Sequence, residues 1–211
     1  MPAALLLPEE QQVCSAFAPK RVREFTAGRV CAHRALAKLG ISDFPIGRRS
    51  DRRPHWPDRI IGSITHTADF VGAVVAPRGQ IRAIGVDAEQ IGRVTSEIIP
   101  LVCTSGEVAW LDALPQDERR KAATIIFSAK EAFYKCQYEV REQWLDFHDI
   151  ALEFDSDTLL QGSFAIRSVR PMTLPEAEAI GFEGRFQVED DLVVTGVTLM
   201  RAGVTRPGVE A

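Results

Sequence analysis

Cysteine and long apolar runs are both scarce in this sequence. The four cysteines contain no CxxC pair, so neither a zinc knuckle nor a redox dithiol is indicated, and we expect four reduced thiols: Cys14, Cys31, Cys103 and Cys136. No window approaches the ~18 consecutive apolar residues of a membrane helix, and the apolar stretch 1–7 is too short for a signal peptide. We therefore expect a cytoplasmic protein without membrane association.

No residue-by-residue internal repeat is present, which excludes a solenoid or an array. The 211 residues are 45% hydrophobic and 26% charged. These values are ordinary for globular proteins and exclude extensive disorder or a fibrous chain. The length predicts one large domain or two closely packed halves.

Charge is unevenly distributed along the chain. Residues 20–59 contain eleven Lys or Arg and four Asp or Glu, a net charge of +7, whereas the whole chain carries −4. This favours a local anion site, such as a site for a phosphorylated ligand, over a surface that binds nucleic acid. A helix with a solvated charged face explains the same pattern.

The first half reads as a helix on a small sheet. Apolar spacing predicts an amphipathic helix over 20–39, which Gly40 ends. Residues 42–59 are rich in Pro and Arg and predict an ordered basic loop without regular structure. Three short apolar runs then predict antiparallel strands, the last two joined by a turn at 77–80: 60–65, 70–76 and 81–86.

The second half repeats this order of elements. Thr104 or Ser105 can cap a helix through Leu111, and a longer helix is expected from about Glu118 to Tyr138. Four strands are expected after it: 150–154, 163–169, 185–188 and 192–199. Both halves therefore predict a helix followed by antiparallel strands.

The motif GVDAE places two carboxylates at the end of a predicted strand. Asp87 and Glu89 are two residues apart, so both side chains project from one face of the sheet. Hard oxygen ligands suit Mg²⁺, which usually takes one or two protein carboxylates. A solvated strand end is the alternative for so short a motif.

The motif FSAKEAFYK lies on the longer predicted helix. Four small or apolar residues form an inward stripe: Ala129, Ala132, Phe133 and Cys136. Glu131 and Lys135 are then one turn apart on another face. Such a pair is commonly a surface salt bridge worth a few tenths of a kcal/mol, ~0.2–0.5.

The motif GSITH ends a predicted strand in a short loop. A hydroxyl and an imidazole beside small residues would let a phosphate approach, with His66 donating a hydrogen bond. The motif is neither a GxxxxGK[ST] loop nor a GxSxG elbow. A structural histidine is the alternative.

The three motifs, in this order and spacing, resemble the 4'-phosphopantetheinyl transferases of the surfactin and enterobactin-synthase type. Further stretches are similar to the enterobactin-synthase branch: KRVREFTAGRVCAHRALAKLG, RPHWP and WLDF. The resemblance covers about residues 18–200. It implies an α/β (α+β) fold, a pseudo-twofold pair of helix-plus-antiparallel-sheet subdomains at 1–98 and 99–211. The sequence itself predicts a flexible tail from about residue 203.

The resemblance also implies an activity. Such enzymes transfer the 4'-phosphopantetheine arm of coenzyme A to a serine of an apo acyl or peptidyl carrier protein and release adenosine 3',5'-bisphosphate. It implies dependence on Mg²⁺, with Mn²⁺ as the other ion considered, a monomer, and an active site between the halves.

By motif position, Asp87, Glu89 and Glu131 would hold the metal, Glu131 directly or through water, with Asp87 facing the coenzyme A pyrophosphate. Glu131 is also the candidate base for the carrier serine, a metal-bound water being the alternative. Lys135 would stabilise charge on the phosphate oxygens, with Lys130 close by.

The remaining coenzyme contacts come from the first half. Thr65 and His66 would bind pyrophosphate, with His66 counted as catalytic, and Arg21 and Arg29 would bind the nucleotide's phosphates, including the 3'-phosphate.

The basic loop departs from the family pattern. Relatives have a lysine three residues before the proline that matches Pro54, whereas this chain has Asp51. Arg52 or Arg53 is expected to take that role.

Two rival functions remain open. A nucleic-acid-binding module would use residues 20–59, but aromatic residues there are few and no recognition motif is present, so no nucleic acid partner is expected. Another Mg²⁺-dependent nucleotide-processing enzyme, such as a phosphodiesterase, would explain the acids and bases but not the whole FSAKEAFYK motif.

Overall fold

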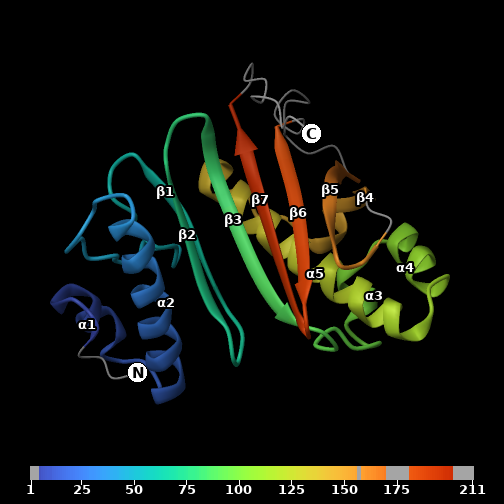
Figure 1. Cartoon of the computed structure of the whole chain (residues 1–211), viewed down its shortest axis with the longest axis horizontal. Coiled ribbons are helices and arrows are strands. Elements are labelled where there is room, and N and C mark those ends of the chain that lie inside the picture. Colours follow the sequence, from blue (N-terminus) through green and yellow to red (C-terminus); the bar gives the residue numbers. More distant parts are fainter. Residues whose placement is uncertain (1–4, 156–157, 170–180, 202–211) are drawn as a thin grey trace.

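Two antiparallel sheets, each with a long helix packed on it, lie side by side in the computed structural model (Figure 1). The structure describes residues 5–155, 158–169 and 181–201. The flexible tail predicted from about residue 203 lies outside the described residues. Within the described residues, no helix combines the length and the apolar character needed to cross a bilayer.

The first sheet is small and carries helix α2. Its two strands, β1 (Ile60–His66) and β2 (Val71–Pro77), pair antiparallel, and the short helix α1 (Pro8–Cys14) precedes α2 (Pro19–Ala37). Phe25, Ala32 and Leu36 of α2 are buried, as the apolar spacing predicts. The basic loop, residues 42–59, has no helix or strand apart from an isolated bridge between Arg48 and Pro54.

The second sheet has five strands in the order β3-β7-β6-β5-β4. The predicted helices and strands of this half are confirmed, and Thr104 is the helix cap. The elements are α3 (Ile99–Val102), α4 (Ser105–Asp112), α5 (Gln116–Arg141), the 3-10 turn η2 (Phe147–Asp149), β4 (Ile150–Asp155), β5 (Gln161–Ser168), β6 (Phe182–Glu189) and β7 (Leu192–Met200).

Strand β3 (Ile81–Gln90) belongs to the larger sheet, which corrects the prediction that it forms part of the first sheet. It pairs antiparallel with β7, with Asp87 opposite Thr195, although a turn joins it to β2. Burial explains why β3 pairs with β7, because α5 packs against both strands. Because β3 crosses between the halves, the predicted division at residue 98 stays a prediction.

Gly85 sets how closely α5 approaches β3. A Cβ at this position would overlap the carbonyl oxygen of Ala132 and crowd the backbone nitrogen of Cys136. The predicted stripe of small residues on α5 is fully buried against the sheet. Because side chains alternate along a strand, Asp87 and Glu89 share the face of Gly85 and point toward α5.

Candidate functional site

The site lies at the seam where the two sheets meet. The backbone N–H groups of Val86 and Ala88 point away from β7 and donate to the hydroxyls of Ser63 (3.1 Å) and Thr65 (3.1 Å). Along this edge of β3, hydroxyl side chains of β1 therefore accept the hydrogen bonds that a neighbouring strand's carbonyl groups would accept in a sheet. This link fixes GSITH and GVDAE against each other.

Asp87 is the centre of the site. Its side chain is 7% exposed, and its Oδ1 accepts hydrogen bonds from Lys135 Nζ (2.7 Å) and from the Thr65 hydroxyl (3.2 Å). Lys135 Nζ also donates to the carbonyl oxygen of Val86, at 3.0 Å. Asp87 Oδ2 is buried and has no hydrogen-bond partner among the described residues. A buried carboxylate oxygen left in this state is costly and suits a ligand with positive charge.

Two further carboxylates are electrostatically coupled to Asp87. Burial, together with the charges of Asp87 and Glu131, raises the pKa of Glu89 to about 7, against the lowering effect of Arg93 and Lys135. Burial also raises the pKa of Glu131, with Lys135 lowering it and Asp87 raising it. The structure thus brings together the three acids that the motifs predict, and their mutual repulsion would be relieved by a cation.

The three acids do not form a ready-made three-ligand cage. Across residues 5–155, 158–169 and 181–201, no three His, Cys, Asp or Glu side chains are close enough to hold one metal ion together. The unsatisfied Oδ2 of Asp87 and the raised pKa of Glu89 nevertheless fit a hard divalent cation, which needs only one or two protein carboxylates. The donor set therefore fits Mg²⁺ with Asp87 and Glu89 as ligands, while Glu131 fits contact through water.

His66 at the end of β1 and Arg21 of α2 are in contact within the first half. Arg21 Nη1 donates to His66 Nε2 at 3.2 Å and to Glu24 Oε2 at 3.1 Å. Burial lowers the pKa of His66, with Glu24 opposing this shift and Arg21 adding to it. His66 is therefore neutral at pH 7 and accepts at Nε2, so its hydrogen-bond donor is Nδ1.

Arg29 is buried beside this pair and holds the basic loop. Its Nε donates to the carbonyl oxygen of Ile46 (2.7 Å) and its Nη2 to that of Gly47 (3.1 Å). Burial lowers its pKa to about 10, with Glu10 opposing this and the charges of Arg21 and Arg48 adding to it. The proposed phosphate contact by Arg29 is thus limited to the part of the guanidinium that the loop does not use.

Arg48 is a functional candidate that sequence reasoning missed. Its charge acts on Arg29 together with that of Arg21, so three arginines share one region. Its guanidinium lies 5.7 Å from the centre of the Phe17 ring. Nothing in the sequence distinguishes Arg48 from the other arginines of the basic loop, because only the path of the loop decides which arginine lies near Arg29.

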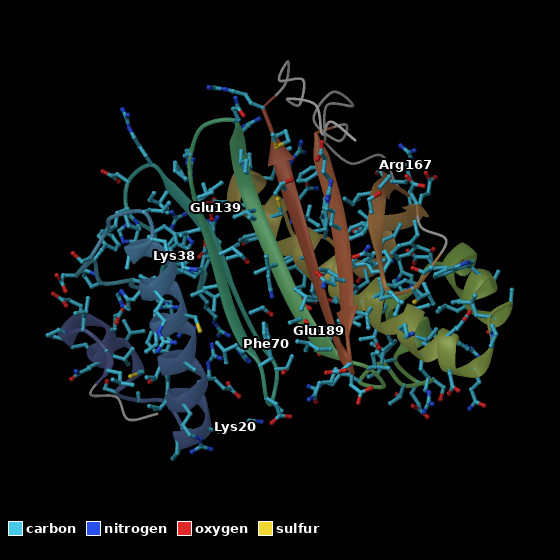
Figure 2. The ribbon with its side chains drawn as sticks, viewed as in Figure 1. Lys20, Lys38, Phe70, Glu139, Arg167 and Glu189 are labelled. Carbon is cyan, nitrogen blue, oxygen red and sulfur yellow. The ribbon has the colours of Figure 1, made fainter. Side chains whose placement is uncertain are left out.

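The structure corrects the assignment of Arg53 as a coenzyme contact. Its guanidinium pairs with Asp51 (2.6 Å) and Glu139 (3.2 Å) and donates to the carbonyl oxygen of Tyr138 (3.0 Å). Figure 2 places Glu139 at the opposite end of the seam from Phe70, the residue whose carbonyl accepts a hydrogen bond from the residue after His66.

The alternative contact, Arg52, is exposed, and its φ of +77° is that of a turn residue. In the described part of the chain, no hydrogen bond or ion pair joins Arg52 to the site. Arg52 as the substitute for the missing lysine therefore stays a prediction.

Lys130 is also corrected, because its ammonium group is fully engaged in the core of the second half. Nζ donates to Glu107 Oε2 (2.8 Å) and to three carbonyl oxygens, those of Val102, Phe147 and Ile150. The side chain is 1% exposed. With every donor used, Lys130 cannot reach a phosphate from this position.

An apolar pocket of about 390 Å³ opens beside Glu131. Its walls come from α5 and from residues 144–150, and they include Phe133, Tyr134 and Trp144. Trp144 is 79% exposed and lies edge-on to Tyr134, at 5.6 Å between ring centroids. The pocket therefore offers aromatic surface next to the Glu131 side chain.

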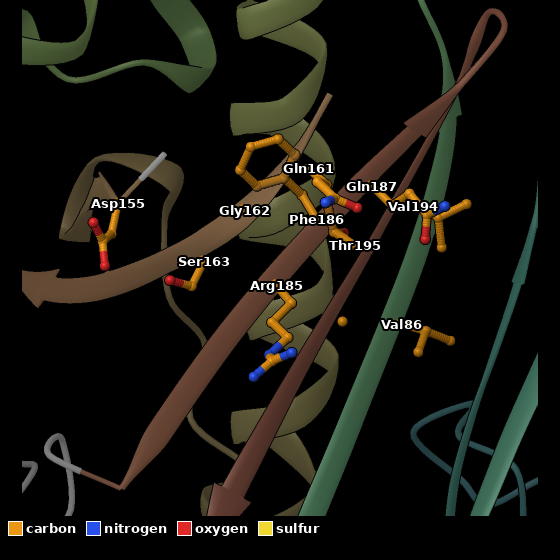
Figure 3. A pocket seen from close by; sticks show the side chains of 11 residues that line it. Val86, Asp155, Gln161, Gly162, Ser163, Arg185, Phe186, Gln187, Val194 and Thr195 are labelled. Carbon is orange, nitrogen blue, oxygen red and sulfur yellow. The ribbon is translucent and has the colours of Figure 1, made fainter. Parts of the chain in front are cut away.

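A second cavity, of about 650 Å³, lies on the face of the larger sheet that is turned away from α5 (Figure 3). Arg185, Gln187, Ser163 and Asp155 point into it. It includes none of the side chains that the motifs predict for the site.

Comparison with known proteins covers both halves. Residues 8–76 match the 4'-phosphopantetheinyl transferase N-terminal domain, and residues 83–175 match the 4'-phosphopantetheinyl transferase superfamily. The chain is 36% identical to 4'-phosphopantetheinyl transferase Svp of Streptomyces mobaraensis, over 94% of this chain and 80% of that protein. It is 34% identical to 4'-phosphopantetheinyl transferase PptT of Mycobacterium tuberculosis, over 94% and 88% of the two chains.

Other similarities are partial. Enterobactin synthase component D of Salmonella typhimurium is 38% identical over 62% of this chain and 54% of that protein. Among solved structures, a holo-(acyl-carrier-protein) synthase of Bacillus anthracis in complex with CoA (3',5'-ADP) has a TM-score of 0.45 and 18% identity, over 59% of this chain and 100% of that chain.

Proposed function

Because the chain belongs to the 4'-phosphopantetheinyl transferase family, we propose that it transfers the phosphopantetheine arm of coenzyme A to a serine of an apo acyl or peptidyl carrier protein. The observation that supports this most strongly is the site around Asp87, where the carboxylates of Glu89 and Glu131 and the ammonium of Lys135 converge on one seam. The leaving group is adenosine 3',5'-bisphosphate.

Asp87 and Glu89 are the residues that would hold Mg²⁺, with Mn²⁺ as a substitute. The bound ion supplies positive charge that neutralises the diphosphate of coenzyme A. The unpartnered Oδ2 of Asp87 and the raised pKa of Glu89 support this assignment.

Glu131 and Lys135 carry out the transfer. The serine oxygen attacks the phosphorus that bears the pantetheine arm, its proton passes to Glu131 or to a water, and the bond to the adenosine bisphosphate breaks. A carboxylate whose pKa is raised by burial is a better base near neutral pH. Lys135, at the Asp87 carboxylate, is placed to stabilise charge on the phosphate oxygens.

The first half binds the nucleotide end of coenzyme A. Arg21, Arg29 and Arg48 supply positive charge for its phosphates, and His66 offers Nδ1–H to the pyrophosphate. Thr65 fixes the Asp87 carboxylate rather than meeting phosphate with a free hydroxyl, because its oxygen already joins Asp87 and Ala88.

The apolar pocket beside Glu131 accommodates the pantetheine arm. The arm is an extended chain with few charges, and the pocket offers ring faces and a mouth marked by the exposed Trp144. An arm in this pocket would bring its phosphate to Glu131 and leave the serine to approach from outside.

The enzyme is proposed to act as a cytoplasmic monomer with two subdomains, residues 1–98 and 99–211, and an active site between them. The seam between β1 and β3 supports this placement, because each side contributes residues to the site.

The test is the intact mass of an apo carrier domain after incubation with the protein, Mg²⁺ and coenzyme A. One phosphopantetheine should be added per carrier, at the acceptor serine, and a carrier with that serine changed to alanine should gain nothing. Coenzyme A cleavage without carrier would instead support a phosphodiesterase. No adduct on any of a panel of carriers would refute the proposal.

A further inference from the structure

A buried carboxylate of α1 holds the basic loop. Glu10 is completely buried, and its Oε1 accepts hydrogen bonds from the backbone N–H of Ile46 (2.8 Å) and from His33 Nε2 (2.9 Å). Its Oε2 accepts from the backbone N–H of Leu7, at 3.1 Å. An acid so deeply buried is retained only where its bonds are made, so this carboxylate has a fixed position.

A cation holds the carbonyl side of the same residue, Ile46. The carbonyl oxygen of Ile46, whose N–H binds Glu10, accepts from Arg29 Nε at 2.7 Å. The next carbonyl oxygen, that of Gly47, accepts from Arg29 Nη2 (3.1 Å) and from the backbone N–H of His55 (3.1 Å). Residues 46 and 47 are thus clamped between a buried carboxylate and a buried guanidinium.

Arg48 follows this clamp directly along the chain. Its guanidinium lies over the Phe17 ring, and its backbone bridges to Pro54, which closes the turn of the basic loop. The direction in which Arg48 leaves the clamp is therefore set by the two peptides that Glu10 and Arg29 hold. Because charge-assisted hydrogen bonds are the stronger kind, losing Glu10 should loosen this turn first.

We propose that Glu10 is a positioning residue for coenzyme A: through the Ile46 peptide it holds the basic loop in the conformation that presents Arg48, beside Arg21 and Arg29, to the nucleotide's phosphates. This inference rests on the proposed function for its ligand. It assigns a role in coenzyme binding to α1, a helix outside the site, whose Glu10 is bonded to Leu7, His33 and Ile46 and not to the carboxylates of the site.

The test compares Glu10→Gln, Glu10→Ala and the control Glu9→Gln. Glu9 lies in the same turn of α1 but is exposed, so its substitution changes charge without touching the clamp. Glu10→Gln should raise the KM for coenzyme A about tenfold, because the amide has no charge and offers one acceptor oxygen where the carboxylate offers two, while kcat changes less than about twofold. Glu10→Ala should raise this KM further, and the KM for the carrier should stay constant in all three variants.

Hydrogen exchange of the backbone amides reports on the clamp without any turnover. Glu10→Gln should speed exchange at Ile46 and His55 by about tenfold while the amides of α5 keep their wild-type rates. Calorimetric titration with coenzyme A alone should show the same loss of affinity as the KM. If Glu10→Ala does not fold, the comparison is made between Glu10→Gln and Glu9→Gln alone.

Unchanged exchange at Ile46 together with an unchanged KM in Glu10→Gln would overturn the proposal, as would a fall in kcat at constant KM. A wild-type protein that binds no coenzyme A would refute the proposed function instead. In that case the exchange rates would still show whether Glu10 holds the loop.

Discussion

Two lysines of α5 make ion pairs of opposite character. Lys130 and Glu107 are 1% and 5% exposed, and all donors of the ammonium are bonded to Glu107 and to backbone carbonyls. Lys135 and Asp87 are 30% and 7% exposed, and one oxygen of the Asp87 carboxylate has no partner in the part of the chain that is described. The step of five positions from Lys130 to Lys135 turns the helix by about 140°, so the two lysines face different surroundings.

The difference indicates that the Lys130 pair stabilises the fold, whereas the Lys135 pair belongs to the candidate site. The Lys130 pair joins α4, α5 and the start of β4, because Glu107 Oε1 also accepts the N–H of Leu152. When all donors and acceptors of an ion pair are hydrogen-bonded within the protein, none is free to bind a ligand. The Lys135 pair is incomplete, and an incomplete polar group at a seam is typical of a binding site.

The largest effect is expected from Asp87→Asn. Transfer to the carrier should fall at least about a thousandfold in kcat/KM, or about 4 kcal/mol, because a metal-binding charge is lost. The melting temperature should hold or rise, since repulsion with Glu89 and Glu131 is relieved. A protein that fails to fold would show that Asp87 has a structural role like that of Lys130, which would contradict the difference between the two ion pairs.

Lys130→Met should act on stability. Removing one partner of a buried pair leaves Glu107 uncompensated, so we expect the free energy of unfolding to fall by about 3 kcal/mol. Urea unfolding measures this loss, and the double variant Lys130→Met/Glu107→Leu should lose less stability than the sum of the two single variants. The transfer rate per folded molecule should stay near the wild-type value. A large fall in this rate would instead indicate that Lys130 acts in the active site.

Lys135→Met should act mainly on rate. We expect kcat to fall about a hundredfold, or about 2.7 kcal/mol, because positive charge at the phosphate oxygens is lost. The loss of stability should be smaller than for Lys130→Met, about 1 kcal/mol, since solvent reaches the group. Stopped reactions analysed by carrier mass separate the two effects, and equal losses of stability in both lysine variants would argue against the distinction.

The smallest effect concerns the pH dependence of stability without metal. The pKa of Glu89 is raised from 4.5 to about 7, so the folded protein binds this proton more tightly than the unfolded chain between those values. Stability should therefore fall as pH rises from 4.5 to 7, by about 1 kcal/mol after allowing for solvent screening. Urea unfolding in EDTA measures this slope, and Glu89→Gln should flatten it while the exposed Glu9→Gln leaves it unchanged.

Much of the fold could be predicted because its signals are local. Apolar spacing located α2 and α5, and the Thr104 cap and the small-residue stripe of α5 are confirmed. The pairing of β3 with β7 could not be predicted, because about a hundred residues separate the strands in the sequence and a turn leads from β2 straight into β3. That pairing depends on which strand α5 covers, which no short window of sequence contains.

The site was predictable as a set of motifs but not in its details. Asp87, Glu131 and Lys135 do converge, whereas Lys130 turns into the core and Arg53 binds the end of α5. A basic residue in a motif looks the same whether its partner is a phosphate, a carbonyl oxygen or a buried acid. Only the position of Glu107 and Glu139 in space decides between them.

The central claim is that a divalent cation and the diphosphate of coenzyme A meet at Asp87. Crystals grown with Mn²⁺ and coenzyme A test it directly through the anomalous signal of manganese. We expect a manganese peak bound by the carboxylates of Asp87 and Glu89, with the diphosphate beside Lys135. A peak elsewhere, or a nucleotide bound on the outer face of the five-stranded sheet, would contradict it.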